Sequence, residues 1–231
     1  ALVSIKALLA DQPEHVDALY MKAVCMRYLG RHDEALLTLT ELQKDNPLFS
    51  RAFQEEGHLQ VARVDQAAAL KAYQQATRLN PALLASWKGQ LAIYNQQQNQ
   101  AAAKQIKLQL DRFSQLPAPL LAAMDLVAQG KLLRAEDICR QFLQKAPRHI
   151  EGMRVLADIG VKLGVLDDAE FLLESAVLMS PDDVQARIEY IEVLRKRQKF
   201  DLALMEAEKL LATNPTNPQF QSLYAIVCMQ T

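Results

Sequence analysis

The prolines of this chain recur at a fixed interval. Six of them form two series with a spacing of 34 residues: Pro13, Pro47 and Pro81, then Pro147, Pro181 and Pro215. Proline cannot continue a helix, because it lacks a backbone N–H and its ring clashes with the preceding turn. A proline that returns at this interval after each helix-like run indicates a tandem array of helical repeats.

Alanine keeps the same register more strictly than proline does. If Pro13 is position 32 of a repeat, position 20 is always alanine: Ala1, Ala35, Ala69, Ala103, Ala135, Ala169 and Ala203. Position 8 is mostly small: Ala23, Gly57, Leu91, Ala123, Ala157, Ile191 and Ala225. We expect these positions to lie where the two helices of a repeat cross, because small side chains let the backbones approach.

The register divides the chain into six full repeats between two half repeats, which predicts fourteen helices. The expected bounds are 1–14 for the first half repeat, 15–49, 50–83, 84–115, 116–149, 150–183 and 184–217 for the full repeats, and 218–231 for the last half repeat. Pro81 and Pro147 are 66 residues apart, two fewer than two periods. We interpret this as a two-residue deletion between Leu110 and Ala123 within one solenoid, and we expect the natural chain to continue beyond both ends.

Composition favours helix and gives no indication of catalysis. The chain has 231 residues, seven glycines and a net charge of -1, so nucleic acid is not an expected partner. No apolar run approaches the ~20 residues of a membrane helix. Cys25, Cys139 and Cys228 are predicted to be reduced and mostly buried. No catalytic, cofactor or metal-ligand pattern is present, so we expect a non-enzymatic protein without a cofactor, located in the cytoplasm.

The repeat resembles the tetratricopeptide repeat family. The residues that match the family pattern best are Phe53, Gly57, Ala69, Tyr73, Ala76 and Pro81, followed by Trp87 and Tyr94. Lys107 and Gln115 depart from it, where an aromatic residue and proline are usual. The resemblance implies an all-α, right-handed superhelix in which the first helix of each repeat lines a concave groove.

In that family, positions 2, 5, 6, 9 and 12 of each first helix face the groove. On this sequence the candidate groove residues are Tyr20, Arg27, Arg51, Gln54, Glu55, His58, Lys88, Asn95, Met124, Arg154, Asp158, Glu189, Glu192 and Arg195. Charged ends around an apolar middle suit a protein or peptide ligand. Chaperone C-termini are excluded, because Tyr20, Val24, Ala85 and Gly89 replace the Lys and Asn or Arg residues of the family's two-carboxylate clamp.

Several segments of the chain also resemble, more narrowly, bacterial sulfotransferases that carry these repeats at their N-terminus. The similar segments are 54–58, 80–83, 85–87, 167–176 and 193–200. This resemblance implies a non-catalytic arm that recruits substrates or partners. The main hypothesis remains a protein-binding scaffold. A third possibility is an oligomerisation scaffold that self-associates through exposed terminal helices, where we expect Leu223, Ile226 and Val227 to lack a cover.

Overall fold

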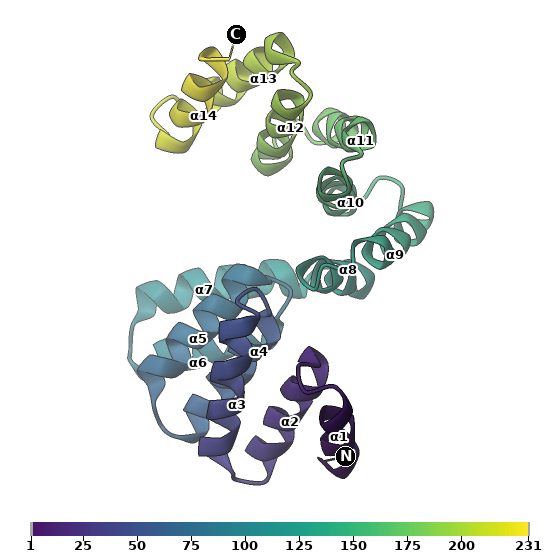
Figure 1. Cartoon of the computed structure of the whole chain (residues 1–231). Coiled ribbons are helices and arrows are strands. Elements are labelled where there is room, and N and C mark those ends of the chain that lie inside the picture. The colour runs from purple at the N-terminus through teal and green to yellow at the C-terminus, as the bar shows by residue number, and fades with distance from the viewer. Residues whose placement is uncertain (1, 231) are drawn as a thin grey trace. The chain divides into compact units, whose positions relative to one another are not determined.

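The computed structural model describes residues 2–230, and every regular element in that range is an α-helix (Figure 1). The fourteen helices are α1 (Leu2–Asp11), α2 (Val16–Tyr28), α3 (His32–Asp45), α4 (Ser50–Ala62), α5 (Gln66–Leu79), α6 (Leu84–Gln96), α7 (Gln100–Ser114), α8 (Ala118–Ala128), α9 (Leu132–Lys145), α10 (Ile150–Leu163), α11 (Leu166–Met179), α12 (Val184–Lys196), α13 (Phe200–Thr213) and α14 (Pro218–Cys228). No described helix combines the length and apolarity that crossing a membrane requires.

Most helices that follow one another in the chain pack on each other, with the exception of α8, which is not among the packed neighbours of α7 or α9. The first helix of a repeat packs on the second, as α2 does on α3, α4 on α5, α10 on α11 and α12 on α13. The second helix then packs on the next first helix, as α3 does on α4 and α11 on α12. The predicted all-α fold class, with about fourteen helices, is confirmed for residues 2–230.

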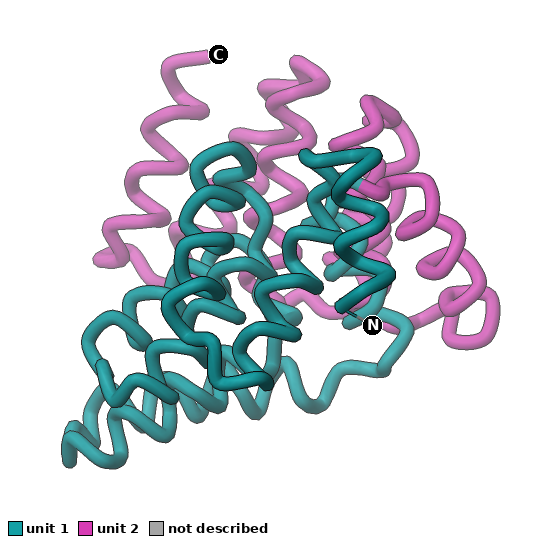
Figure 2. Tube along the Cα trace, turned by 60° about the horizontal axis from the view of Figure 1, so that its bottom comes forward, with its two compact units in different colours: residues 1–130 teal, residues 131–231 magenta. Residues whose placement is uncertain are grey.

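The chain divides into two compact units, residues 1–130 and 131–231 (Figure 2). The division falls between α8 and α9, inside the predicted repeat 116–149. The interpretation of the whole chain as one solenoid stays a prediction.

The repeated alanines lie in the core of both units. Ala35, Ala69, Ala135, Ala169 and Ala203 are fully buried and Ala103 is 8% exposed, whereas Ala1 lies outside the described residues. Position 8 follows the rule less strictly, because Leu91 is half-buried and Ala225 is exposed.

The turn inside each hairpin needs one residue in the left-handed region. Three repeats supply glycine there: Gly30, Gly130 and Gly164 have φ between 73° and 80°. Three others place a side chain in the same conformation: Val64, Gln98 and Gln198 have φ between 56° and 63°. Glycine adopts this region without steric cost, whereas a β-branched residue such as Val64 is strained in it.

The irregular repeat is explained by its first helix. α8 has 11 residues, whereas α4 and α6 have 13 each. Pro117 is its N-cap and Pro119 lies in its first turn, so the prolines set a late start for the helix. This start lies inside the stretch 110–123 to which the sequence assigns the deletion.

Two expectations about exposure are wrong in part. Leu223 and Val227 of α14 are 8% and 0% exposed because they pack into the core of unit 2, and only Ile226 is exposed. None of the three cysteines is in a disulfide, but only Cys139 is buried, whereas Cys25 is half-buried and Cys228 is exposed. The self-association predicted through an uncovered terminal helix therefore loses two of its three apolar contacts.

Candidate binding surfaces

In unit 1, predicted groove residues of α2 and α4 form a buried ion pair. Arg27 donates to both carboxylate oxygens of Glu55, with Nε–Oε1 and Nη2–Oε2 distances of 2.5 and 3.4 Å. The Glu55 side chain is only 4% exposed. Burial raises the pKa of Glu55, and the neighbouring Arg27 opposes that rise. Because both charges are used within the chain, this pair holds two neighbouring first helices together.

Arg51 is also paired, with a residue that sequence reasoning did not single out. It donates to Oδ2 of Asp125 on α8. The same carboxylate accepts from Asn80 Nδ2 at 2.8 Å and from Gln129 Nε2 at 2.9 Å. Asn80 is fully buried and also accepts from the backbone N–H of Ala82 at 3.0 Å. Asp125 therefore ties α8 to α4 and to the turn between α5 and α6.

His58, another predicted groove residue, contacts Tyr73 of the second helix in its own repeat. Its Nδ1 lies 2.7 Å from the Tyr73 hydroxyl oxygen. Burial lowers the pKa of His58, and the positive charge of Arg27 lowers it further. Burial raises the pKa of Tyr73 to about 12. His58 is thus held neutral as a partner of a buried tyrosine.

The remaining candidates of unit 1 differ in their surroundings. Gln54 accepts a hydrogen bond from Ser86 of α6 at 3.2 Å. The ring of Tyr20 meets the edge of Phe49, with 5.7 Å between centroids. Met124 is half-buried, and Lys88 and Asn95 are exposed.

In unit 2, a buried arginine joins α10 to α12. Arg154 is 8% exposed and contacts both oxygens of Glu189 at 2.9 and 2.6 Å. It also donates to Glu151 at 2.5 Å. Burial lowers the pKa of Arg154, but the hydrogen bonds and charge of Glu189 outweigh that effect and leave it raised.

Three other candidates of unit 2 meet in one place. Asp158, Glu189 and Glu192 line a pocket of about 320 Å³ between α10 and α12, which we call the acidic pocket. Its other lining residues are Val161, Leu173, Gln185, Ile188, Val193 and Lys196. The floor is therefore apolar, and the rim carries three carboxylates and one ammonium group, that of Lys196.

Asp158 and Glu192 pair with neighbours on their own helices, whereas Glu189 is held by Arg154 of α10. Asp158 contacts Lys162, and its side chain is 51% exposed. Glu192 accepts from Arg195 at 2.8 and 2.9 Å and is 44% exposed. Arg195 also donates to Gln230 at 2.7 Å. Ion pairs three or four residues apart on a helix are weak when the carboxylate is about half exposed, so a ligand cation can compete for Asp158 and Glu192.

Comparison with known families identifies the repeat. Two models described as tetratricopeptide repeat match the chain, one at residues 1–48 and the other at residues 162–227. Both matched segments carry tetratricopeptide repeats. The matched segments lie at the two ends of the chain, one in each unit, and the repeats between them follow the same helical pattern.

Solved structures with tetratricopeptide repeats are similar at low identity. A tetratricopeptide repeat protein from Parabacteroides merdae is 18% identical with a TM-score of 0.45, over 99% of this chain and 91% of that one. TTC0263 from Thermus thermophilus is 20% identical with a TM-score of 0.40, over 93% and 99%. The structure of Naa15/Naa10 bound to HypK-THB is 21% identical with a TM-score of 0.45, but this chain spans 36% of its matched chain.

No curated protein matches the chain. The narrower resemblance to sulfotransferases therefore stays a prediction. In tetratricopeptide repeat numbering, the acidic pocket uses positions 9 and 12 of the repeat that begins with α10. It also uses positions 2, 5, 6 and 9 of the repeat that begins with α12. These are the positions that the resemblance assigns to the groove.

Proposed function

We propose that this chain is a protein-binding scaffold and that the acidic pocket of unit 2 binds a short segment of a partner protein. The observation that carries the proposal is the convergence of Asp158, Glu189 and Glu192 around an apolar floor. Tetratricopeptide repeat folds are known as scaffolds for protein–protein interaction, which supports the general class of function.

The lining of the pocket specifies the ligand chemistry. A large apolar side chain of the ligand would contact Val161, Leu173 and Ile188, which gains free energy through burial of apolar surface. A neighbouring lysine or arginine of the ligand would lie against Asp158 and Glu192, whose side chains are 51% and 44% exposed. The preferred motif is therefore an apolar residue next to a basic residue.

The equivalent surface of unit 1 fits this role less well. Its charged candidates, Arg27, Arg51 and Glu55, are already paired within the unit. A ligand would have to break the buried pair of Arg27 and Glu55, which leaves an uncompensated charge and is costly. The acidic pocket offers carboxylates without that cost.

Selection of peptides from a random twelve-residue display library on the purified chain tests the proposal. We expect enrichment of sequences with an apolar residue beside lysine or arginine. The selected peptides, labelled with fluorescein, should bind Asp158→Lys/Glu192→Lys about tenfold more weakly than wild type in fluorescence polarisation.

A matched variant keeps the same change of net charge on the same unit. Asp182 and Glu208 are exposed and lie outside the acidic pocket. Asp182→Lys/Glu208→Lys should bind the selected peptides as wild type does. Equal binding to the wild-type chain and Asp158→Lys/Glu192→Lys would show that the acidic pocket is not the binding site.

A further inference from the structure

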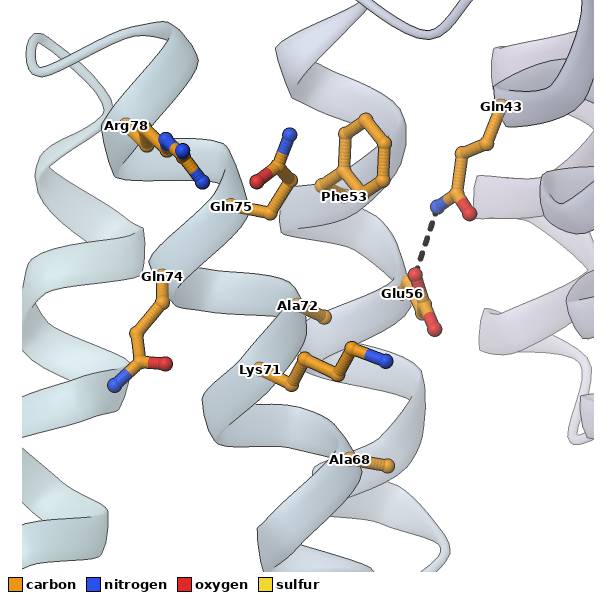
Figure 3. Close-up of a pocket in the computed structure, with 9 residues that line it drawn as sticks. All are labelled: Gln43, Phe53, Glu56, Ala68, Lys71, Ala72, Gln74, Gln75 and Arg78. Atoms are coloured by element: carbon orange, nitrogen blue, oxygen red, sulfur yellow. Dashed lines mark hydrogen bonds between the residues drawn. The ribbon is translucent and has the colours of Figure 1, made fainter.

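Unit 1 has a larger pocket on the opposite side of α4 from Arg51, Glu55 and His58. Phe53 and Glu56 of α4 line it, and helical periodicity places positions 53 and 56 on the face opposite positions 51, 55 and 58. Its volume is about 620 Å³, and its other walls come from α3 and α5 (Figure 3). We call it the α3–α5 pocket.

The pocket exists because small side chains stand where larger ones would close it. Ala68 and Ala72 of α5 face this space, and Phe53 remains half-buried between α5 and Gln43 of α3 (Figure 3). Gln43 Nε2 donates to Glu56 at 2.8 Å, which fixes the far wall. The centre of the pocket therefore presents part of an aromatic ring to solvent.

Two cations lie along the α5 side of this pocket. Lys71 and Arg78 are both exposed, and neither forms an ion pair within 4 Å with any residue from 2 to 230. They are seven residues apart, so they lie on one face of α5 and about 10 Å apart along its axis. Glu56 would repel a carboxylate near the centre. A complementary surface thus has an acid, a central apolar group and a second acid.

Unit 2 carries such a surface on the exposed side of α11. Asp167, Phe171, Glu174 and Leu178 follow one another at i, i+4, i+7 and i+11 and share one helical face. Phe171 is 68% exposed and Leu178 is 74% exposed. Asp167 is 81% exposed although it contacts Arg197, and Glu174 is exposed as well. We call these four residues the α11 face.

We propose that the α11 face of one copy of this chain docks into the α3–α5 pocket of a second copy. The two carboxylates of the α11 face have the same seven-residue spacing as Lys71 and Arg78. Phe171 lies between the carboxylates and would pack against Phe53. Because two different surfaces meet, the contact is heterologous and joins copies head to tail.

The partner is a second copy because the complementary residues belong to this same chain. Phe171 is 68% exposed in unit 2, and an apolar ring between two acids complements the aromatic centre and the two cations of the α3–α5 pocket. The proposal uses neither Asp158 nor Glu192, so it stands or falls separately from the acidic pocket.

Sedimentation velocity of the full chain at low ionic strength tests the contact over a range of concentrations. We expect the mean mass of wild type to rise with concentration. Lys71→Glu/Arg78→Glu and Asp167→Lys/Glu174→Lys should each stay monomeric, because each makes both surfaces the same sign and weakens association by about tenfold or more. Mixing the two variants restores opposite charges, so the mixture should associate again.

Two controls have matched chemistry. Lys104→Glu/Lys107→Glu makes the same charge change at exposed lysines of α7 and should associate as wild type does. Phe171→Ser should stay monomeric, whereas Leu133→Ser, at a leucine that is 69% exposed, should not. A wild-type chain that is monomeric at every concentration overturns the proposal, and so does a mixture of the charge variants that fails to associate.

Discussion

The hydroxyl of Tyr73 and Nδ1 of His58 lie 2.7 Å apart, and their rings meet edge to face with 5.4 Å between centroids. The two residues come from the two helices of one hairpin. A histidine that sequence reasoning assigned to ligand binding thus contributes to the packing of its own repeat.

This contact predicts a pH dependence of stability. The pKa of His58 in the folded chain is lowered by burial and by Arg27, so the folded state binds its proton less readily than the unfolded state. The stabilisation is therefore present above the ordinary pKa of about 6.5 and is lost as pH falls through the folded pKa. We expect the free energy of unfolding in urea to fall between about pH 7.5 and about pH 5.5.

His58→Gln should remove that part of the pH dependence, whereas His32→Gln, at the start of α3, should retain it. Glu55 changes stability with pH in the opposite direction to His58, because burial raises the pKa of Glu55. Its contribution to the free energy of unfolding is lost as pH rises through its pKa in the folded chain. An unchanged pH profile in His58→Gln would contradict a lowered pKa at this site.

The ring of Tyr73 predicts that alanine is not tolerated at two glycines. A Cβ added at Gly57 of α4 or at Gly89 of α6 would overlap the Tyr73 ring from either side. Glycine to alanine inside a helix normally stabilises by about 1 kcal/mol. Here we expect Gly57→Ala to destabilise unit 1 by about 1–3 kcal/mol through overpacking, measured by chemical denaturation.

The variant Tyr73→Leu is the control for that prediction, because it removes the aromatic ring. Because the clash is with the ring, Gly57→Ala should cost clearly less in the Tyr73→Leu background than in wild type. Additive effects of the two substitutions would place the cost of alanine elsewhere.

Val64 offers a stabilising substitution. Its φ of 63° lies in the left-handed region, and its side chain is 83% exposed, so no packing offsets the strain. Val64→Gly should raise the free energy of unfolding by about 1 kcal/mol. Val61→Gly, at a half-exposed position inside α4, should lower it by about 1 kcal/mol, because glycine is unfavourable in a helix. A destabilised Val64→Gly would rule out strain at this turn.

The repeat register was predictable because it rests on a steric rule. The alanines at position 20 recur because two backbones must approach there, and five of the six described ones are fully buried. Register alone fixes which face a side chain occupies.

Register does not determine which side chains pair. Arg27 and Glu55 were both expected to face a ligand, but they come from neighbouring first helices and neutralise each other. Asp125 lies at a position that the family pattern does not assign to the groove. Its role depends on where α8 lies against α4, which no local spacing encodes. The burial of Leu223 and Val227 likewise follows from how α14 packs on α13.

Asp125 should be more costly to remove than Arg51. Asp125→Ala leaves Arg51, Asn80 and Gln129 without their shared acceptor, and Asn80 is fully buried. A buried donor without an acceptor costs about 1–3 kcal/mol. The partly exposed ion pair between Arg51 and Asp125 contributes less than about 1 kcal/mol. In thermal or urea unfolding, Asp125→Ala should therefore lose more stability than Arg51→Ala.

Asp33→Ala is the matched control, because Asp33 pairs with Arg63 and is 91% exposed. It should change stability by less than about 0.5 kcal/mol. An Asp125→Ala variant that is as stable as Asp33→Ala would mean that water replaces the carboxylate for Asn80.

The pairing of Arg51 with Asp125 also bears on the order in which unit 1 folds. The two residues are 74 positions apart, whereas Arg27 and Glu55 are 28 apart. Closing a long flexible loop costs chain entropy before any contact repays it. Formation of the α4–α5 and α6–α7 hairpins first replaces most of that loop with rigid structure. We therefore expect α8 to dock last, so that hydrogen exchange at its amides reports the final step of folding rather than its nucleus.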